Sequence, residues 1–252
     1  MKVKLNSHIR NLMKLPALLL AFSLVLLMCS CTLDKNHDQP VQLTMFSTVP
    51  GYEKSTDNEI RKLIAEKTGV QVFEIWMIGQ NIRNPIDSLL DNNMITDYLY
   101  VNERLDEFYE HGMLVAWDDY IEKYPNIKKL YTEEEWDQLR QADGHIYSVN
   151  IPGGPASPED FMEGCVLTNK AGFAVTTSCK DPDTAFRFIN DIISEEILKL
   201  RFWGIEGVDY LVDKDGSYYR TSEMNDKWND TDYEINHVCS YTMMPGVGVM
   251  GK

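Results

Sequence analysis

The sequence predicts an α/β fold with a mostly parallel sheet, as its first predicted strands and helix show. Residues 41–48 alternate in polarity as a strand does, and residues 70–77 are rich in β-branched and aromatic side chains. Between them, a capping box of Thr56 and Glu59 and a terminal Gly69 predict a helix. A strand, a helix and a second strand within about 35 residues form a βαβ unit, which implies parallel strands.

The following elements continue this alternation of helices and strands. The longest helix should begin at the capping residue Asp181, continue through Pro182 with apolar residues at helical spacing, and end at Gly204. Residues 209–221 should form a hairpin, because an Asp-Gly pair in their middle favours a tight turn. Further helices are expected over residues 84–90, 103–111, 118–124 and 133–141, and further strands over residues 97–101, 146–151, 165–168 and 173–177.

Two parts of the chain lack such a pattern. Residues 152–158 contain three prolines and two glycines, which predicts a loop or linker rather than core. From Ser222 the chain is polar, and no terminal element is expected. The sequence therefore divides into an N-terminal α/β lobe over residues 41–150, a junction over 151–163, a shortened remainder over 164–221 and an irregular tail over 222–252.

Residues 1–30 have the composition of an export signal. Four basic residues, Lys2, Lys4, Arg10 and Lys14, precede an apolar run over residues 15–28. A basic segment followed by a short apolar one is typical of a secretory signal peptide. The apolar run is shorter than the roughly 20 residues that span a bilayer. A buried core helix is the alternative, and the signal peptide is favoured because nothing in the run could form a solvated face.

The end of this signal resembles a bacterial lipobox, in which a small residue precedes the acylated cysteine. Cys31 follows Ser30, whereas Cys29 follows the bulky Met28, so Cys31 is the expected lipidation site. Two acyl chains would hold the mature chain at the extracellular face of the cell membrane. The polar residues 31–40 would form a flexible tether. Simple secretion after cleavage nearby is the alternative.

The expected mature chain is strongly acidic. Removing residues 1–30 takes away four basic residues and no acidic residue, which leaves 20 basic against 39 acidic residues and a formal charge of −19. Because phosphate binding needs a basic surface, nucleic acid is not an expected partner. The charge otherwise indicates solubility outside the cell.

Sequence signatures of catalysis and of metal binding are absent. The five histidines have no HxxH or HExxH spacing and no CxxC pair occurs, so no zinc site is expected. There is no GxSxG and no GxxxxGK[ST] sequence. Residues 213–216 resemble the start of a calcium loop, but the glycine comes at the fourth position instead of the sixth, which favours a hairpin turn. We therefore expect a protein that is not an enzyme and uses no cofactor or metal.

The mature cysteines besides Cys31 are Cys165, Cys179 and Cys239. An odd number at wide spacing does not indicate a disulfide framework. Cys165 and Cys179 could form a bridge or remain buried free thiols, and the sequence leaves both possibilities open.

Two tryptophans are candidate ligand contacts. Trp76 ends a predicted strand, and the ligand crevice of a parallel α/β sheet lies at the carboxyl ends of its strands. Trp117 precedes a predicted helix. Sugars stack their apolar faces on such flat rings while carboxylates and amides bind the hydroxyls. Core packing is the alternative for each of them, and it is the preferred interpretation of Trp203, on the apolar side of the longest helix.

Five segments of this chain, in order, resemble the extracellular solute-binding lipoproteins of bacterial ABC importers, in particular their long Gram-positive branch. They are residues 57–72, 110–131, 143–149, 178–195 and 203–219. The resemblance implies two α/β lobes of the periplasmic-binding-protein type that close about a hinge on a carbohydrate-type ligand. Residues 91–101 resemble a family segment with a ligand-facing aspartate, which implies Asp97 as a ligand contact.

The chain departs from this family in two places. Residues 150–178 stand where the family has a long stretch that builds most of the second lobe, and family members continue beyond this C-terminus with further helices. We therefore expect one complete lobe and an incomplete second lobe.

The expected function is a lipid-anchored, monomeric solute-binding component of an ABC importer for a sugar or oligosaccharide, acting with a membrane permease. One alternative is a truncated or vestigial surface lipoprotein without ligand binding, with a structural or interaction role. A further alternative is an extracellular glycan hydrolase, which needs a carboxylate pair that spacing alone does not identify among 39 acidic residues.

Overall fold

The chain divides into two units, Met1–Gln39 and Pro40–Lys252, and the fold described below is that of the second. The computed structural model describes residues 39–49, 51, 53–76, 83–92, 95–150 and 167–246. The expected signal peptide, the lipidation site Cys31 and the junction over residues 151–163 lie outside the described residues. No helix in the described ranges is long and apolar enough to cross a membrane.

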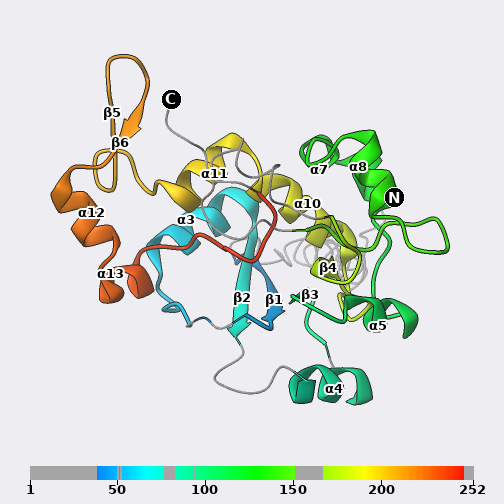
Figure 1. The fold of residues 1–252 in the computed structure, drawn as a ribbon. Helices are drawn as coiled ribbons and strands as arrows, with labels where there is room; N and C mark the ends of the chain where they lie inside the picture. The colour runs from blue at the N-terminus through cyan, green and yellow to red at the C-terminus, as the bar shows by residue number, and fades with distance from the viewer. Residues whose placement is uncertain are drawn as a thin grey trace, which may run out of the picture. The chain divides into compact units, whose positions relative to one another are not determined.

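A four-stranded sheet in the order β2-β1-β3-β4 forms the centre of this unit (Figure 1). Strand β1 pairs in parallel with β2 along its whole length and with β3, whereas β4 runs antiparallel to β3. The mostly parallel sheet confirms the predicted α/β fold class. The strands are β1 (Val41–Ser47), β2 (Val70–Trp76), β3 (Tyr98–Val101) and β4 (Gly172–Val175).

Helix α3 (Glu59–Thr68) connects β1 to β2 and completes the predicted βαβ unit. Its end at Gly69 is confirmed, since Gly69 adopts the left-handed conformation with φ of 70°. The predicted capping box of Thr56 and Glu59 is wrong, because Asn58 is the N-cap and accepts a hydrogen bond from the Arg61 backbone N–H at 3.0 Å. The Asn58 amide also donates to two carbonyls near the C-terminus, which favours this residue as the cap.

The other predicted helices appear with small shifts in their ends, and α7 was not predicted. They are α4 (Arg83–Asn92), α5 (Leu105–Glu110), α6 (Asp118–Lys123), α7 (Pro125–Lys128), α8 (Glu133–Gln138), α10 (Pro182–Ile192) and α11 (Glu195–Phe202). The longest predicted helix is two helices, α10 and α11, which meet at Ser194. The Ser194 hydroxyl donates to the Asp191 carbonyl at 2.6 Å and so replaces a backbone bond that a continuous helix would make.

Three further sequence predictions are corrected by the structure. Residues 146–151 do not form a strand where they are described; they make isolated bridges at Ile146 and Val149. The tail is not irregular throughout, because it contains α12 (Ser222–Trp228) and α13 (Thr231–Asn236). Trp203 is half-buried against the Arg220 guanidinium instead of lying in the core. The predicted hairpin is confirmed as β5 (Leu211–Val212) and β6 (Tyr218–Tyr219).

Both faces of the sheet are covered, as a parallel sheet requires. Along β3, Tyr98 belongs to the core on the side of α3 and α10, whereas Leu99 and Val101 belong to the core on the side of α4 and α5 (Figure 1). This alternation follows from the two-residue period of a strand. Cys179 is buried and is a free thiol within the described part of the chain. Cys165 lies outside the described residues.

The C-terminal segment, residues 238–246, is fixed to the fold by Arg201 of α11, whose side chain is fully buried. The guanidinium donates five hydrogen bonds of 2.7–3.2 Å to backbone carbonyls and forms no ion pair with any described residue. Burial lowers the pKa of Arg201 to about 10. The five accepting carbonyls belong to Ile192, Ser240, Tyr241, Met244 and Pro245.

His237 fastens the start of the same segment to α3. Its Nδ1 lies 2.8 Å from the Glu59 carboxylate and its Nε2 lies 2.8 Å from that of Asp209. The Tyr233 hydroxyl donates to Asp209 at 2.5 Å, and its ring stacks on the imidazole. Burial alone would lower the pKa of His237, but the hydrogen bonds and charges of Asp209 and Glu59 raise it above its ordinary value. Protonation of His237 therefore strengthens this link.

Asn150 forms hydrogen bonds across the gap in the described residues, which lies between residues 150 and 167. Its side-chain N–H groups donate to the carbonyls of Thr168 and Ala171 at 2.9 and 2.7 Å, and its oxygen accepts from the Thr168 backbone N–H at 2.9 Å. Val149 and Phe173 exchange two backbone hydrogen bonds beside this contact. The residues on the two sides of this gap therefore lie side by side next to the sheet.

Replacing Arg201 with methionine should lower the free energy of unfolding by about 3–5 kcal/mol, because five buried carbonyls lose their donor together. Urea unfolding measures this change. Arg140→Met is the matched control, since the Arg140 side chain is 38% exposed and its ion pairs with Asp118 and Asp137 lie at the surface. The control should lose no more than about 1 kcal/mol. Equal losses in the two variants would contradict the role given to Arg201.

Candidate functional site

A cavity of about 170 Å³ lies at the carboxyl end of β2, which is an edge strand of the sheet. We call it the Glu74–Trp76 pocket, after the two β2 residues in its wall. The chain before α3, helix α13 and the C-terminal segment held by Arg201 supply the other walls. The lining residues are Gly51, Lys54, Glu74, Trp76, Glu234, Ser240, Tyr241, Thr242 and Met243.

The strand places Glu74 and Trp76 on the same side of the sheet, because residues two apart on a strand face the same way. Glu74 is 9% exposed, and Trp76 is half-buried. Gly51 packs against the indole so closely that a Cβ at that position would lie 2.3 Å from the ring carbons. A glycine is therefore needed for the chain to cover one face of Trp76.

Two polar atoms in this pocket have no hydrogen-bond partner among the described residues. They are Oε1 of Glu74 and Nε1 of Trp76, and both are inaccessible to solvent. Buried polar atoms in native proteins are nearly always hydrogen-bonded to protein, water or ligand. Both side chains line the pocket, so a ligand bound there is a candidate partner for these two atoms.

The charge of Glu74 depends on pH near neutrality. Burial raises the pKa of Glu74 to about 7, although the positive charges of Arg61, Lys54 and Arg201 act in the opposite direction. Lys54 forms an ion pair of 2.9 Å with Glu234 at the pocket, and its side chain is only 9% exposed. Glu74 itself forms no ion pair within the described part of the chain. Near neutral pH its carboxyl is therefore present in both protonation states.

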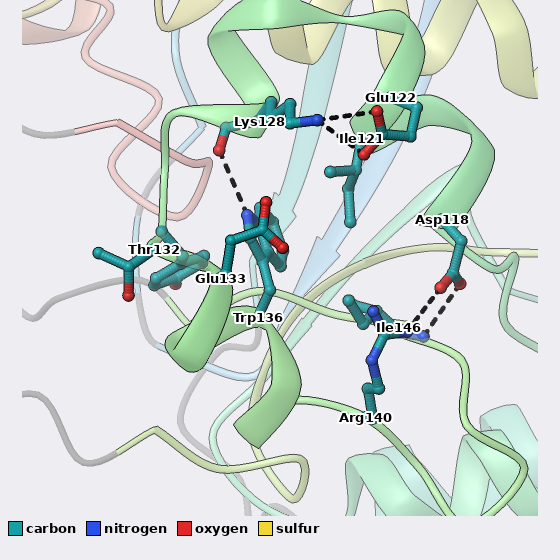
Figure 2. Close-up of a pocket in the computed structure, with 10 residues that line it drawn as sticks. Asp118, Ile121, Glu122, Lys128, Thr132, Glu133, Trp136, Arg140 and Ile146 are labelled. Carbon is teal, nitrogen blue, oxygen red and sulfur yellow. Dashed lines mark hydrogen bonds and ion pairs between the residues drawn. The ribbon is translucent and has the colours of Figure 1, made fainter.

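A second cavity, of about 360 Å³, lies between α6, α7 and α8 (Figure 2). Its apolar wall consists of Ile121, Tyr131, Trp136 and Ile146, and its charged rim contains Asp118, Glu122, Lys128, Glu133 and Arg140, with Thr132.

Several polar groups of this second cavity bind one another, as Figure 2 shows. Arg140 donates to Asp118 at 2.8 Å, and the Trp136 indole donates to the Lys128 carbonyl at 3.3 Å. Burial alone would raise the pKa of Asp118, but the hydrogen bonds from Arg140, the Ile146 backbone and His145 lower it. No lining residue of this cavity is among the described residues with an unpartnered buried side-chain atom. This cavity therefore has fewer unpartnered polar side-chain atoms for a ligand than the Glu74–Trp76 pocket has.

Of the three predicted ligand contacts, Trp76 lines a described cavity. Asp97 precedes β3, at the opposite end from the carboxyl edge, and accepts hydrogen bonds of 2.8 Å from both the backbone N–H and the hydroxyl of Thr44. Trp117 is fully buried, and its ring packs edge-on against Phe173 and Phe186. The structure thus gives Asp97 and Trp117 structural contacts and does not bring them to the pocket. Their roles as ligand contacts stay predictions.

The sequence analysis missed Glu74, although a signal was available. Glu74 is the one charged residue in the β2 sequence VQVFEIW, and it falls on the same face as the buried Val70 and Val72. A charged residue in a buried register of a strand often has a functional reason. The other pocket walls, at Lys54 and at residues 240–243, have no comparable sequence pattern that would have predicted them. No cluster of three or more potential metal ligands occurs among the described residues.

Comparison with known proteins shows the fold of this chain. No family model and no curated protein sequence matches it. The alginate-binding protein AlgQ2, solved without calcium ion, aligns over 82% of this chain and 81% of its own, with a TM-score of 0.56 and 12% identity. An extracellular solute-binding protein from Bifidobacterium longum subsp. infantis aligns over 85% and 79%, with a TM-score of 0.55 and 10% identity.

A third structure is the N-glycan transport solute-binding protein NgtS from Streptococcus pneumoniae in complex with Man1GlcNAc. It aligns over 82% of this chain and 78% of its own, with a TM-score of 0.53 and 10% identity. At such identities the likeness is one of fold. The chain therefore has the α/β fold of bacterial solute-binding proteins, and its neighbours are described as binding proteins, not enzymes. The described residues contain one four-stranded sheet and one two-stranded hairpin, as expected for an incomplete second lobe.

Glu74→Gln should raise the free energy of unfolding more at about pH 8.5 than at about pH 5. The pKa of Glu74 rises from 4.5 to about 7 on folding, so the wild-type protein loses stability as the pH rises through this interval. The difference between the two pH values should be on the order of 2 kcal/mol. Urea unfolding of both proteins at both pH values measures it.

Glu66→Gln is the matched control, because Glu66 is an exposed residue of α3. Its effect should be small at both pH values. A pH-independent effect of Glu74→Gln would show that burial does not raise the pKa of this carboxyl.

Proposed function

We propose that this chain is the lipid-anchored solute-binding component of an ABC importer and that it binds a sugar or oligosaccharide. The observation that carries the proposal is the Glu74–Trp76 pocket, which is lined by two side chains that each have a buried polar atom without a partner among the described residues. This pocket lies at the carboxyl end of a parallel strand, where α/β folds bind their ligands.

The chemistry of the pocket supports a sugar as the solute. An aromatic ring can stack on the apolar face of a sugar, and a carboxyl can bind its hydroxyls. Neighbours in fold are described as binding alginate, transporting N-glycans and holding fructo-nystose. These ligands belong to those proteins, and they support a carbohydrate here as a class.

The transport role is supported by the sequence. The expected signal peptide and Cys31 would place the mature chain at the outer face of the cell membrane, where a permease could receive the solute. The five segments that resemble the lipoproteins of ABC importers support membership of their long Gram-positive branch. We propose that the protein acts there as a monomer.

Adding the correct sugar to the purified mature chain should raise its melting temperature, because a ligand that binds only the folded state stabilises it. Trp76→Leu should abolish this shift, and Trp76→Phe should weaken binding about tenfold or more by removing the indole N–H. Trp136→Phe, in the cavity between α6, α7 and α8, is the matched control and should bind as the wild type does. A panel of neutral and acidic sugars and oligosaccharides serves as the probe.

The same panel separates the alternative functions. If no sugar stabilises the chain, the importer role is excluded and a surface lipoprotein without ligand binding is favoured. If shorter sugars are released from an oligosaccharide, the protein is a glycan hydrolase instead.

Cys31→Ser should release the protein from the membrane fraction of expressing cells, because it removes the acylated residue. The wild-type protein and Cys29→Ser should both remain in the membrane fraction, and mass spectrometry of the mature N-terminus should find the lipid on Cys31. Release by Cys29→Ser instead would place the lipid on Cys29. A wild-type protein found in the medium would favour simple secretion.

A further inference from the structure

The Glu74–Trp76 pocket presents an acceptor and a donor that a single kind of group can satisfy. A hydroxyl both donates and accepts, so it can donate to Oε1 of Glu74 and another can accept from Nε1 of Trp76. The two residues are two apart on β2, which separates their Cα atoms by about 7 Å.

Two of the three cations near the pocket are engaged, and the third, Arg61, does not line it, although its buried Nε has no hydrogen-bond partner among the described residues. Lys54 is held by Glu234 at 2.9 Å, and Arg201 donates to five backbone carbonyls. Arg61 is 2% exposed, does not line the pocket and lies over the ring of Phe73 at 5.6 Å. None of these three groups presents a free positive charge to a bound anion.

The acidic groups at the pocket would oppose an anionic ligand. Glu74, Glu234 and Lys54 all line it, and because Lys54 is paired with Glu234, Glu74 is the lining carboxyl without an ion-pair partner among the described residues. A ligand carboxylate could accept from the Trp76 indole, but it has no proton to give to Glu74 Oε1. It would also place a like charge beside a buried carboxyl that has no ion-pair partner among the described residues.

The state of Glu74 favours a hydroxyl in a second way. Because the pKa of Glu74 is about 7, the ionised carboxyl predominates at about pH 7.5, where it accepts from a hydroxyl and repels an anion. A cavity of about 170 Å³ is smaller than the sites that enclose whole drug-sized ligands, which measure roughly 300–1,000 Å³. The pocket therefore suits one unit of a solute rather than an entire oligosaccharide.

We propose that the Glu74–Trp76 pocket selects a neutral sugar unit over the corresponding uronic acid and that Glu74 is the residue that makes this distinction. This inference rests on the proposed function, and it narrows the solute from carbohydrates in general to neutral ones. Trp76 supplies the ring and the donor, and Glu74 supplies the acceptor and the rejection of an anion.

Matched pairs of sugars test the inference on the full mature chain. Glucose, galactose and mannose, and short oligosaccharides that contain them, are compared by calorimetry with the corresponding uronic acids at about pH 7.5. For a pair that binds the wild type, the neutral sugar should bind at least about tenfold more tightly than its uronic acid. Glu74→Gln keeps an acceptor and a donor at the same place without the charge, so the ratio of affinities should fall to about threefold or less. Glu66→Gln should leave the ratio unchanged.

The possible outcomes separate this inference from the importer role. If sugars bind but the acidic member binds as well as the neutral one, the inference is overturned and the importer role stands. The same holds if Glu74→Gln binds both members but leaves the ratio unchanged. Circular dichroism melting confirms that each variant is folded, and the double variant Glu74→Gln, Glu234→Gln tests whether Glu234 replaces Glu74 as the rejecting group. If no sugar binds the wild type, both proposals fail.

Discussion

The buried guanidinium of Arg201 is the interaction on which this side of the protein depends. The carbonyls that surround it come from Ile192, the last residue of α10, and from residues 240–245 of the C-terminal segment. This segment has no helix or strand, and Arg201 holds it against the fold. That path places Ser240 and Thr242 in the pocket wall and brings the Val238 carbonyl to the Asn58 cap of α3. One side chain thus determines a pocket wall and supports the start of a helix.

The buried carboxyl that suits this pocket for binding also lowers the stability of the fold. Glu74 has no ion pair within the described part of the chain, and its burial weakens the fold above neutral pH. Apolar residues at the same strand position would pack without this cost. A buried carboxyl that faces a cavity is typical of groups retained for recognition, since stability and function often compete at binding sites. Arg61, Lys54 and Arg201 moderate the cost without occupying the cavity.

Local signals predicted much of the fold, and long-range contacts account for what they missed. The βαβ unit, the left-handed Gly69 and the Asp181 cap depend on residues close together in sequence, and the structure confirms them. The cap of α3 was misplaced because the carbonyls that select Asn58 lie 177 and 180 residues away. Trp76 was predicted from the rule that ligands bind at strand ends, and it lines a cavity. The pocket itself could not be predicted, since its walls come from four separate parts of the chain: residues 51–54, β2, α13 and residues 240–243.

The contact at Asn150 has a consequence for how such a chain can change during evolution. One amide ties residue 150 to residues 168 and 171, so the sheet is closed at this point whatever chain connects them. The entropy of closing a flexible connection grows only with the logarithm of its length. A connection of very different length could therefore join residues 150 and 168 while β3 and β4 remain paired.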